Sequence, residues 1–267
     1  YKLKKNGIDT THALGKIFKK HGLRLKALGL KDASAVTEQF VFTTSKMKHD
    51  FEINEPRYSL KKIGFTDKPL SKKEMVGNHF QIKIDNASDI VSQFEEYDRI
   101  LNFYGYQRFG STRPISHLIG KSLLQKNYLN AIQILLSSTS EYDKPENTEL
   151  RKMMSDKSKY HEALKIIPNG MDLEKTVLKE MIESDNPVRA IRALPLQIRR
   201  FFVHAYQSFI FNKTLSASFE NGEEVFSPQE DDVCYDKNGN LGKFENDPCQ
   251  RLSIPFVGYS YYKKTRF

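Results

Sequence analysis

The spacing of apolar residues changes twice along the chain, and this constrains the fold more than any other feature. Residues 36–43 are rich in Val, Thr and Phe, which is typical of a strand, and residues 79–84 alternate apolar and polar side chains. Residues 114–219 instead repeat apolar side chains at helical spacing, and a β-type pattern returns from residue 223. The order of elements in the first part predicts an α+β sheet rather than a parallel doubly wound one.

The first part of the chain predicts one helix between strands. Thr10 or Thr11 suits the N-cap of this helix, and Gly22 suits its end. Strands are expected at residues 23–30 and 36–43, on either side of a short turn.

Three further predictions concern later segments. The apolar spacing of residues 90–101 predicts an amphipathic helix. Residues 141–159 are strongly charged, which favours a surface loop with one helical turn. Asn238-Gly239 indicates a hairpin with a type I′ turn.

Asp32 lies in a turn of small residues between two predicted strands. Lys31 precedes this carboxylate, and an apolar, β-branched run follows it. Functional groups are often held on such connections. From local chemistry alone, however, an Asp that only caps the turn is the favoured interpretation.

Four sequence blocks carry a resemblance that reverses this preference. Gly29–Gln39 resembles the G-x-K-D-x-x-A-x-T-x-Q signature of the TruD family of pseudouridine synthases, with all six fixed letters present. Asn102–Gly110 resembles the family's N-[YF]-[FY]-G-x-Q-R-F-G block, and Gly77–Phe80 its G-N-x-F block. Ala205–Asn212 resembles its S-x-x-F-N helix. The four blocks occur in the family's order, and the resemblance covers nearly the whole chain.

The resemblance implies an RNA-modifying isomerase that converts uridine to pseudouridine, typically uridine-13 in the D-arm of tRNA, without a cofactor. It implies a catalytic domain with a mixed, mainly antiparallel sheet at residues 1–138 and an inserted helical and β domain at residues 139–267. The chain opens without Met inside an expected strand at Tyr1-Lys2-Leu3. The family's returning catalytic strands are expected after Phe267, so we expect a chain that is incomplete at both ends.

The resemblance also implies roles for individual residues. Asp32 is the expected catalytic carboxylate. The candidates for the cation that keeps it ionised are Lys31, Lys5 and a basic residue in the part of the protein expected before Tyr1. Tyr104 corresponds to the aromatic residue that stacks on the target base, a position that is often Phe in the family. A core aromatic is the alternative for Tyr104. Asn102 is a candidate for hydrogen bonding to the uracil edge.

Four supporting residues complete the predicted site. Thr37 and Gln39 lie two apart on a strand and so share one face, from which they are expected to orient the Asp32 turn. Gln107 and Arg108 are expected either to contact RNA or to brace the turn between two glycines.

The charge of the chain favours a polyanionic partner. The net charge is +9 and the pI about 9.3. Residues 1–112 hold 20 Lys and Arg against 13 Asp and Glu, so most of the excess lies in the part that contains Asp32. Lys19, Lys20 and Arg24 are candidates for contacts with the RNA backbone, and a solvated helix face is the alternative.

Several function classes are disfavoured by the sequence. No phosphate-cradling glycine motif occurs, and two cysteines are too few for a four-cysteine zinc site, so no metal is expected. Asp236–Asn240 fails as a calcium loop because its glycine is misplaced. No apolar run approaches the length of a membrane span, and a cytoplasmic location is expected.

Two alternatives to a pseudouridine synthase remain at this point. The first is a catalytically idle RNA-binding protein on the same scaffold, and the intact Asp32 argues against it. The second is a nucleoside hydrolase that works without a metal and releases free uracil.

Overall fold

The computed structural model describes residues 1–45, 52–97, 99–254 and 256–258, without the side chains of residues 88–90. The chain forms two compact units, Tyr1–Ala87 and Ser88–Phe267, and each is described by itself. The predicted division after residue 138 concerns an inserted domain and stays a prediction.

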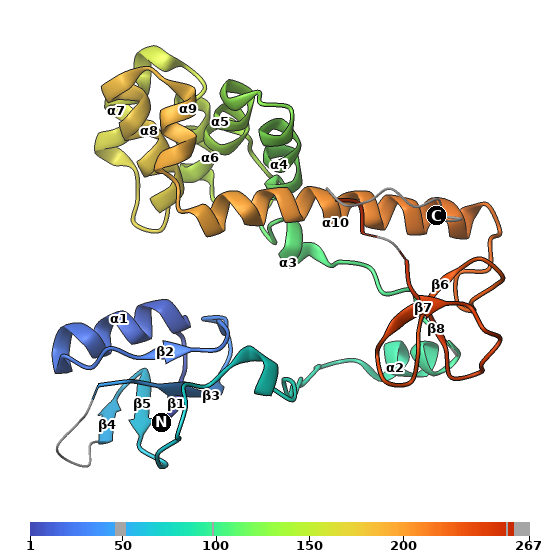
Figure 1. The fold of residues 1–267 in the computed structure, drawn as a ribbon. Coiled ribbons are helices and arrows are strands. Elements are labelled where there is room, and N and C mark those ends of the chain that lie inside the picture. Colours follow the sequence, from blue (N-terminus) through green and yellow to red (C-terminus); the bar gives the residue numbers. More distant parts are fainter. Residues whose placement is uncertain (46–51, 98, 255, 259–267) are drawn as a thin grey trace. The chain divides into compact units, whose positions relative to one another are not determined.

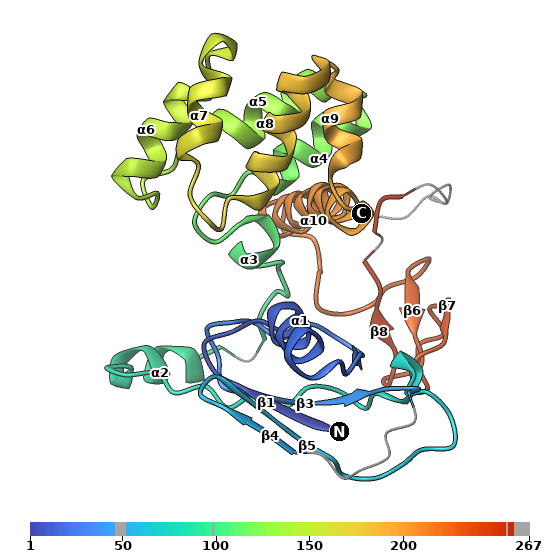
Figure 2. The same ribbon diagram turned by 90° about the vertical axis from the view of Figure 1, so that its left-hand side faces the viewer.

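The first unit is an antiparallel sheet covered on one face by a helix (Figure 2). The strand order is β2-β3-β1-β5-β4, and each neighbouring pair is antiparallel. Together with the helices of the second unit, this sheet confirms the predicted α+β class. The elements are β1 (Lys2–Lys5), α1 (Thr10–His21), β2 (Lys26–Ala27), β3 (Thr37–Phe42), β4 (Glu52–Glu55), β5 (Tyr58–Lys61) and η1 (Lys72–Glu74).

Helix α1 confirms the predicted helix but begins with a different cap. Asp9 is the N-cap, and its carboxylate accepts a hydrogen bond from the amide of His12 at 3.0 Å. Thr10 is instead the first residue of the helix; it is fully buried, and its hydroxyl oxygen accepts a hydrogen bond from the amide of Lys31. Ala13 and Ile17 place the apolar face of the helix on the sheet. As predicted, the helix ends before Gly22.

Two predicted strands of the first unit are wrong in extent or in kind, whereas β3 confirms the strand at 36–43. The strand expected at 23–30 shrinks to the two residues of β2. Residues 79–84 form no strand, and Phe80 and Ile82 are 73% and 76% exposed. Alternation creates an apolar face, but a strand also needs an edge to pair with, and no described strand pairs with this segment.

The second unit contains a group of packed helices, a long helix and a small sheet (Figure 1). The sheet order is β7-β6-β8, with antiparallel pairs. The helices are α2 (Ser88–Glu95), α3 (Tyr106–Phe109), α4 (Ser116–Leu124), α5 (Tyr128–Ser137), α6 (Pro145–Met153), α7 (Tyr160–Ile166), α8 (Asp172–Ser184), α9 (Pro187–Ala193) and α10 (Leu196–Glu220), with a 3-10 turn η2 (Lys157–Lys159). The strands are β6 (Val233–Tyr235), β7 (Leu241–Lys243) and β8 (Arg251–Leu252).

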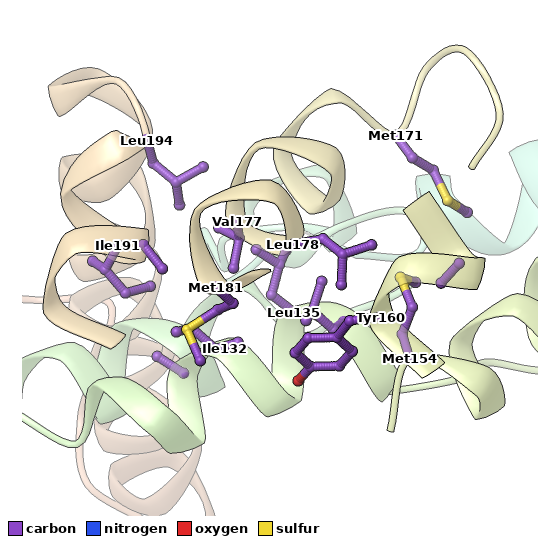
Figure 3. Packing of buried hydrophobic residues seen from close by; sticks show 14 of the residues in the cluster. Ile132, Leu135, Met154, Tyr160, Met171, Val177, Leu178, Met181, Ile191 and Leu194 are labelled. Carbon is purple, nitrogen blue, oxygen red and sulfur yellow. The ribbon is translucent and has the colours of Figure 1, made fainter. Parts of the chain in front are cut away.

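The helices bury one apolar core, which confirms the helical pattern of residues 114–219. Figure 3 shows Ile132 and Leu135 of α5 facing Val177, Leu178 and Met181 of α8. Helix α10 packs closely against α4, and the contact is closest at a glycine. A Cβ atom at Gly120 would lie 2.0 Å from the carbonyl oxygen of Phe202, so the two backbones nearly touch.

The prediction of a surface loop at 141–159 is wrong, because this segment contains α6 and buries Leu150 and Met154. The many charged residues of this segment favoured a solvent-exposed loop, but some of these charges form ion pairs inside the unit. Arg151 is 5% exposed and lies 3.2 Å from carboxylate oxygens of both Asp143 and Glu174.

One further carboxylate contact extends this buried network. Arg113 donates to Glu174 at 2.8 Å, and the same arginine donates to the carbonyl oxygens of Leu135 and Ser138. Burial lowers the pKa of Arg113 to about 10.

Two other elements differ from their predictions in detail. Helix α2 ends at Glu95, short of the predicted residue 101, and Tyr97 beyond it is 67% exposed, so no apolar surface supports further turns. The hairpin between β6 and β7 is confirmed, but its turn is not type I′. Only Gly239 has positive φ, and its amide bonds to the carbonyl oxygen of Asp236 at 3.0 Å. This is a three-residue loop with glycine in the left-handed position.

Candidate active site

The loop that carries Asp32 lies between β2 and β3 and is fastened to the start of α1 by a threonine. The amide of Lys31 donates to the hydroxyl oxygen of Thr10 at 2.9 Å, and the amide of Thr10 donates to the carbonyl oxygen of Lys31 at 3.3 Å. The side chain of Gln39 donates to the same hydroxyl oxygen at 2.9 Å. The backbone immediately before Asp32 is therefore fixed, while the Asp32 side chain is exposed.

Lys5 contacts the Asp32 loop from the sheet. Its side chain is buried, with the residue only 1% exposed, and its ammonium group donates to the carbonyl oxygen of Asp32 at 2.5 Å. Burial lowers the pKa of Lys5, while the negative charges of Asp9 and Asp32 act in the opposite direction. Lys5 is on β1, the strand next to β3. A buried cation therefore lies against the loop that carries the candidate carboxylate.

The other predicted residues of this loop are placed differently. The ammonium group of Lys31 bonds to the side-chain oxygen of Asn78, which joins the Gly77–Phe80 block to the Asp32 block within the first unit. Gln39 supports the loop through Thr10, as described above. The hydroxyl oxygen of Thr37 is buried and makes no hydrogen bond to the described residues.

Tyr104, the predicted base-stacking residue, lies in the second unit and is held there by residues that the sequence did not predict. The side-chain amide of Asn212 on α10 bonds twice to the Tyr104 backbone. Its oxygen accepts from the Tyr104 amide at 3.0 Å, and its nitrogen donates to the Tyr104 carbonyl at 2.9 Å. The half-buried ring of Tyr104 meets the rings of Phe211 and Phe256 edge-on, with centroids 5.6 and 5.9 Å apart.

Arg108 packs against the ring of Tyr104 rather than extending away from the unit. The carbon of its guanidinium group lies 5.1 Å from the ring centroid of Tyr104 and 6.0 Å from that of Phe201. This geometry favours the bracing role over the RNA contact. Asn102 and Gln107 are exposed on either side of Tyr104.

Lys19, Lys20 and Arg24, the predicted RNA-backbone residues, are all exposed in the first unit, but their environments differ. Lys20 lies 2.5 Å from a carboxylate oxygen of Glu55, and this hydrogen bond raises its pKa. Arg24 lies over the ring of Phe18 at 5.0 Å. Lys19 makes no ion pair with any described residue.

Sequence reasoning missed Thr10 and Asn212 as residues that position the site. Thr10 was interpreted only as a helix cap, and its contacts with residues 31 and 39 leave no mark in the local pattern. Asn212 does carry a signal, because it is the last letter of the S-x-x-F-N block. Its partner Tyr104 is 108 positions away, so the contact could not be predicted.

Two absences among the described residues bear on other functions. No group of three or more His, Cys, Asp or Glu side chains within them could hold a metal ion. None of the helices in the described part of the chain is long and apolar enough to cross a membrane.

Comparison with known proteins agrees with this fold. The model of the family described as tRNA pseudouridine synthase D (TruD) matches residues 1–253. The chain therefore belongs to the TruD family.

Two relatives are each called "Probable tRNA pseudouridine synthase D". The protein of Nanoarchaeum equitans is 30% identical over 271 residues, which cover 99% of this chain and 68% of the relative. The protein of Methanopyrus kandleri is 31% identical over 245 residues, which cover 88% of this chain and 61% of the relative. The chain thus spans roughly two thirds of the length of these relatives.

A solved structure has the same fold. The crystal structure of the putative tRNA pseudouridine synthase D from Methanosarcina mazei matches with a TM-score of 0.60 and 23% identity. The match covers 93% of this chain and 62% of that chain.

Proposed function

We propose that this chain acts as a pseudouridine synthase that isomerises uridine in tRNA, specifically uridine-13, in the cytoplasm. The observation that carries the proposal is the fastened Asp32 loop with the buried Lys5 against it, in a chain of the TruD family. A catalytic domain at residues 1–138 and an inserted domain at residues 139–267 belong to the same proposal.

The reaction needs one anionic group beside the ribose. The C1′–N1 bond breaks, the uracil turns, and a new bond joins C1′ to C5. The proton on C5 leaves to solvent, and N1 takes up a proton, so no redox equivalent is consumed. The Asp32 carboxylate serves this sequence as a nucleophile at the sugar or as a base.

Lys5 is assigned as the cation that favours the ionised form of Asp32. The ammonium group of Lys5 contacts the backbone of the Asp32 loop, and burial lowers the pKa of Lys5 more than the negative charge of Asp32 raises it. Lys31 is the weaker candidate, because its ammonium group is bonded to Asn78.

Tyr104 is assigned to stack on the uracil after it leaves the RNA stack, and Asn102 to bond its polar edge. Stacking of a base on an aromatic ring contributes about 1–3 kcal/mol. The double contact with Asn212 fixes the Tyr104 backbone and so restricts where the ring lies.

Substitution of Tyr104 separates stacking from a core role. Tyr104→Phe keeps the ring and should be nearly neutral. Tyr104→Ala should lower activity at least tenfold, with a smaller loss of stability than the roughly 3–5 kcal/mol of a buried aromatic truncation. If Tyr104→Ala loses activity only in proportion to stability, the ring is structural. An inactive Tyr104→Phe would assign a function to the hydroxyl instead.

The proposed activity is tested with tRNA labelled with tritium at C5 of uracil. Isomerisation releases tritium into water without free uracil, because the base stays attached to the RNA. Release of free uracil would instead show a nucleoside hydrolase. Binding of tRNA with neither product would show an idle RNA-binding protein. Mapping of pseudouridine in the product RNA then tests uridine-13, and modification only at another position would refute that assignment.

A further inference from the structure

The net positive charge of this chain comes entirely from the residues of the first unit. Residues 1–87 hold 18 Lys and Arg against nine Asp and Glu, which gives the whole net charge of +9. The remaining residues hold 24 of each kind and are neutral overall. An anionic partner is therefore attracted to the unit that contains Asp32.

Part of this charge surrounds a groove between the C-terminal half of α1 and the turn that joins β4 to β5. The groove has a volume of about 430 Å³. Its polar and aromatic lining consists of Lys16, Lys19, Lys20, Glu55, Arg57 and Tyr58. Four cations thus face one carboxylate, and Lys20 is the cation that pairs with it.

The groove and the Asp32 loop lie at the same end of the strands of this sheet. Residue pairing places Thr37, Lys5, Tyr58 and Glu55 in one row across β3, β1, β5 and β4. Lys5 contacts Asp32, whereas Tyr58 and Glu55 line the groove. Neighbouring strands are about 4.8 Å apart, and Tyr58 and Glu55 lie one and two strands from Lys5, so their backbones are about 5–10 Å from that of Lys5.

The shape of the groove favours a polymer backbone over a small anion. Lys16, Lys19 and Lys20 occupy positions i, i+3 and i+4 of α1, so they form a row along the helix rather than a convergent pocket. Arg57 lines the groove from the turn between β4 and β5. Exposed cations in a row match successive phosphates, and phosphate contacts of this kind dominate RNA affinity.

We propose that this groove binds phosphates of the substrate RNA strand a few nucleotides from the uridine at Asp32. The inference rests on the proposed function, and it identifies the surface along which the RNA lies next to the target uridine. It also revises the predicted set of backbone contacts. Lys16 and Arg57 join Lys19 and Lys20, whereas Arg24 is not among the residues that line the groove.

The test is a double substitution, Lys16→Gln with Lys19→Gln, measured by tRNA binding at several salt concentrations. Affinity falls as salt rises, and each lost phosphate contact makes the slope of log affinity against log salt shallower by about 0.7–0.9. The double variant should therefore have a slope that is shallower than that of wild type by about 1.4–1.8. The matched control is Lys72→Gln with Lys73→Gln, which removes two exposed charges of the same unit outside the groove.

Truncated RNAs locate the occupant. When the RNA strand beside the target uridine is shortened, wild type should bind the RNA more weakly. The double variant should bind the shortened and the full-length RNA with nearly equal affinity, because it already lacks the contacts that shortening removes. An unchanged salt slope in the double variant would refute the groove, and so would an equal loss in the control. If wild type forms pseudouridine but the double variant has an unchanged salt slope, RNA binding by the groove is refuted and the proposed activity is not. If tRNA binds to both proteins with the expected slopes but no pseudouridine forms, the proposed activity is refuted and RNA binding by the groove is not.

Discussion

Replacement of Lys5 by methionine separates the chemistry of the site from its stability. The ammonium group makes a 2.5 Å hydrogen bond to the Asp32 carbonyl oxygen, and the residue is 1% exposed. Loss of a hydrogen bond from a charged donor costs about 1.5–3 kcal/mol. Removal of a buried charge recovers a desolvation penalty of several kcal/mol, which offsets that loss. Methionine also has a similar length and shape.

We therefore expect Lys5→Met to fold with a free energy of unfolding within about 2 kcal/mol of wild type. Its activity should fall much further. Loss of one preorganised electrostatic partner at a reacting centre costs about 100- to 1,000-fold in rate, or roughly 2.7–4 kcal/mol. Tritium release and urea unfolding, measured on the same preparation, provide the two quantities.

The pH dependence of stability gives an independent measurement on the same pair of proteins. Burial holds the pKa of Lys5 below its ordinary value of 10.5. Between that lowered pKa and 10.5, the folded chain binds fewer protons than the unfolded chain, so the free energy of unfolding rises with pH. Lys5→Met lacks this contribution. The stability of wild type relative to the variant should therefore increase as pH approaches 10.5.

Two results would refute this reasoning. If Lys5→Met retains more than about a tenth of the wild-type rate, which is roughly 1.4 kcal/mol of barrier, Lys5 is not the electrostatic partner of Asp32. If the variant fails to fold, the lysine is structural, and its contact with the loop does not report on catalysis.

Two further predictions concern the second unit. Asn212→Leu removes both hydrogen bonds to the Tyr104 backbone and should lower the free energy of unfolding by about 1–3 kcal/mol, because two backbone groups lose their partners. It should also lower turnover of the folded protein at least about tenfold. Unchanged turnover in a tritium-release assay would show that Asn212 does not position the Tyr104 ring. Gly120→Ala places a Cβ atom 2.0 Å from the carbonyl oxygen of Phe202 and should destabilise the chain by about 1–3 kcal/mol in urea unfolding. The control is Gly15→Ala on α1, where no atom lies within 4 Å of the added Cβ, and it should be neutral or stabilising.

Local patterns predicted the elements whose cause is local. Helix α1 follows from its apolar spacing and its glycine stop, and β3 from a β-branched run. The segment at 79–84 has an equally clear alternation and forms no strand, because pairing depends on a distant edge that its own residues do not specify. At 141–159 the many charges concealed α6, since Arg151 pairs inside the core rather than with solvent.

The candidate site shows the same division. Asp32 and Tyr104 could be selected because each lies in a short, dense block of family letters. Their supports could not be selected, because Thr10 reaches residue 31 and Asn212 reaches residue 104 through contacts that only the folded chain creates. Lys5 was one of several candidate cations, and its burial against the loop is the feature that distinguishes it from Lys31.

The most direct test of the central claim is Asp32→Asn, assayed for pseudouridine formation and for tRNA affinity on one preparation. Asparagine has the same shape but cannot ionise. Because the Asp32 side chain is exposed and the contact with Lys5 is made by its backbone, fold and affinity should be nearly unchanged. The account predicts no detectable turnover. Retention of more than about a tenth of the wild-type rate, roughly 1.4 kcal/mol of barrier, would contradict it.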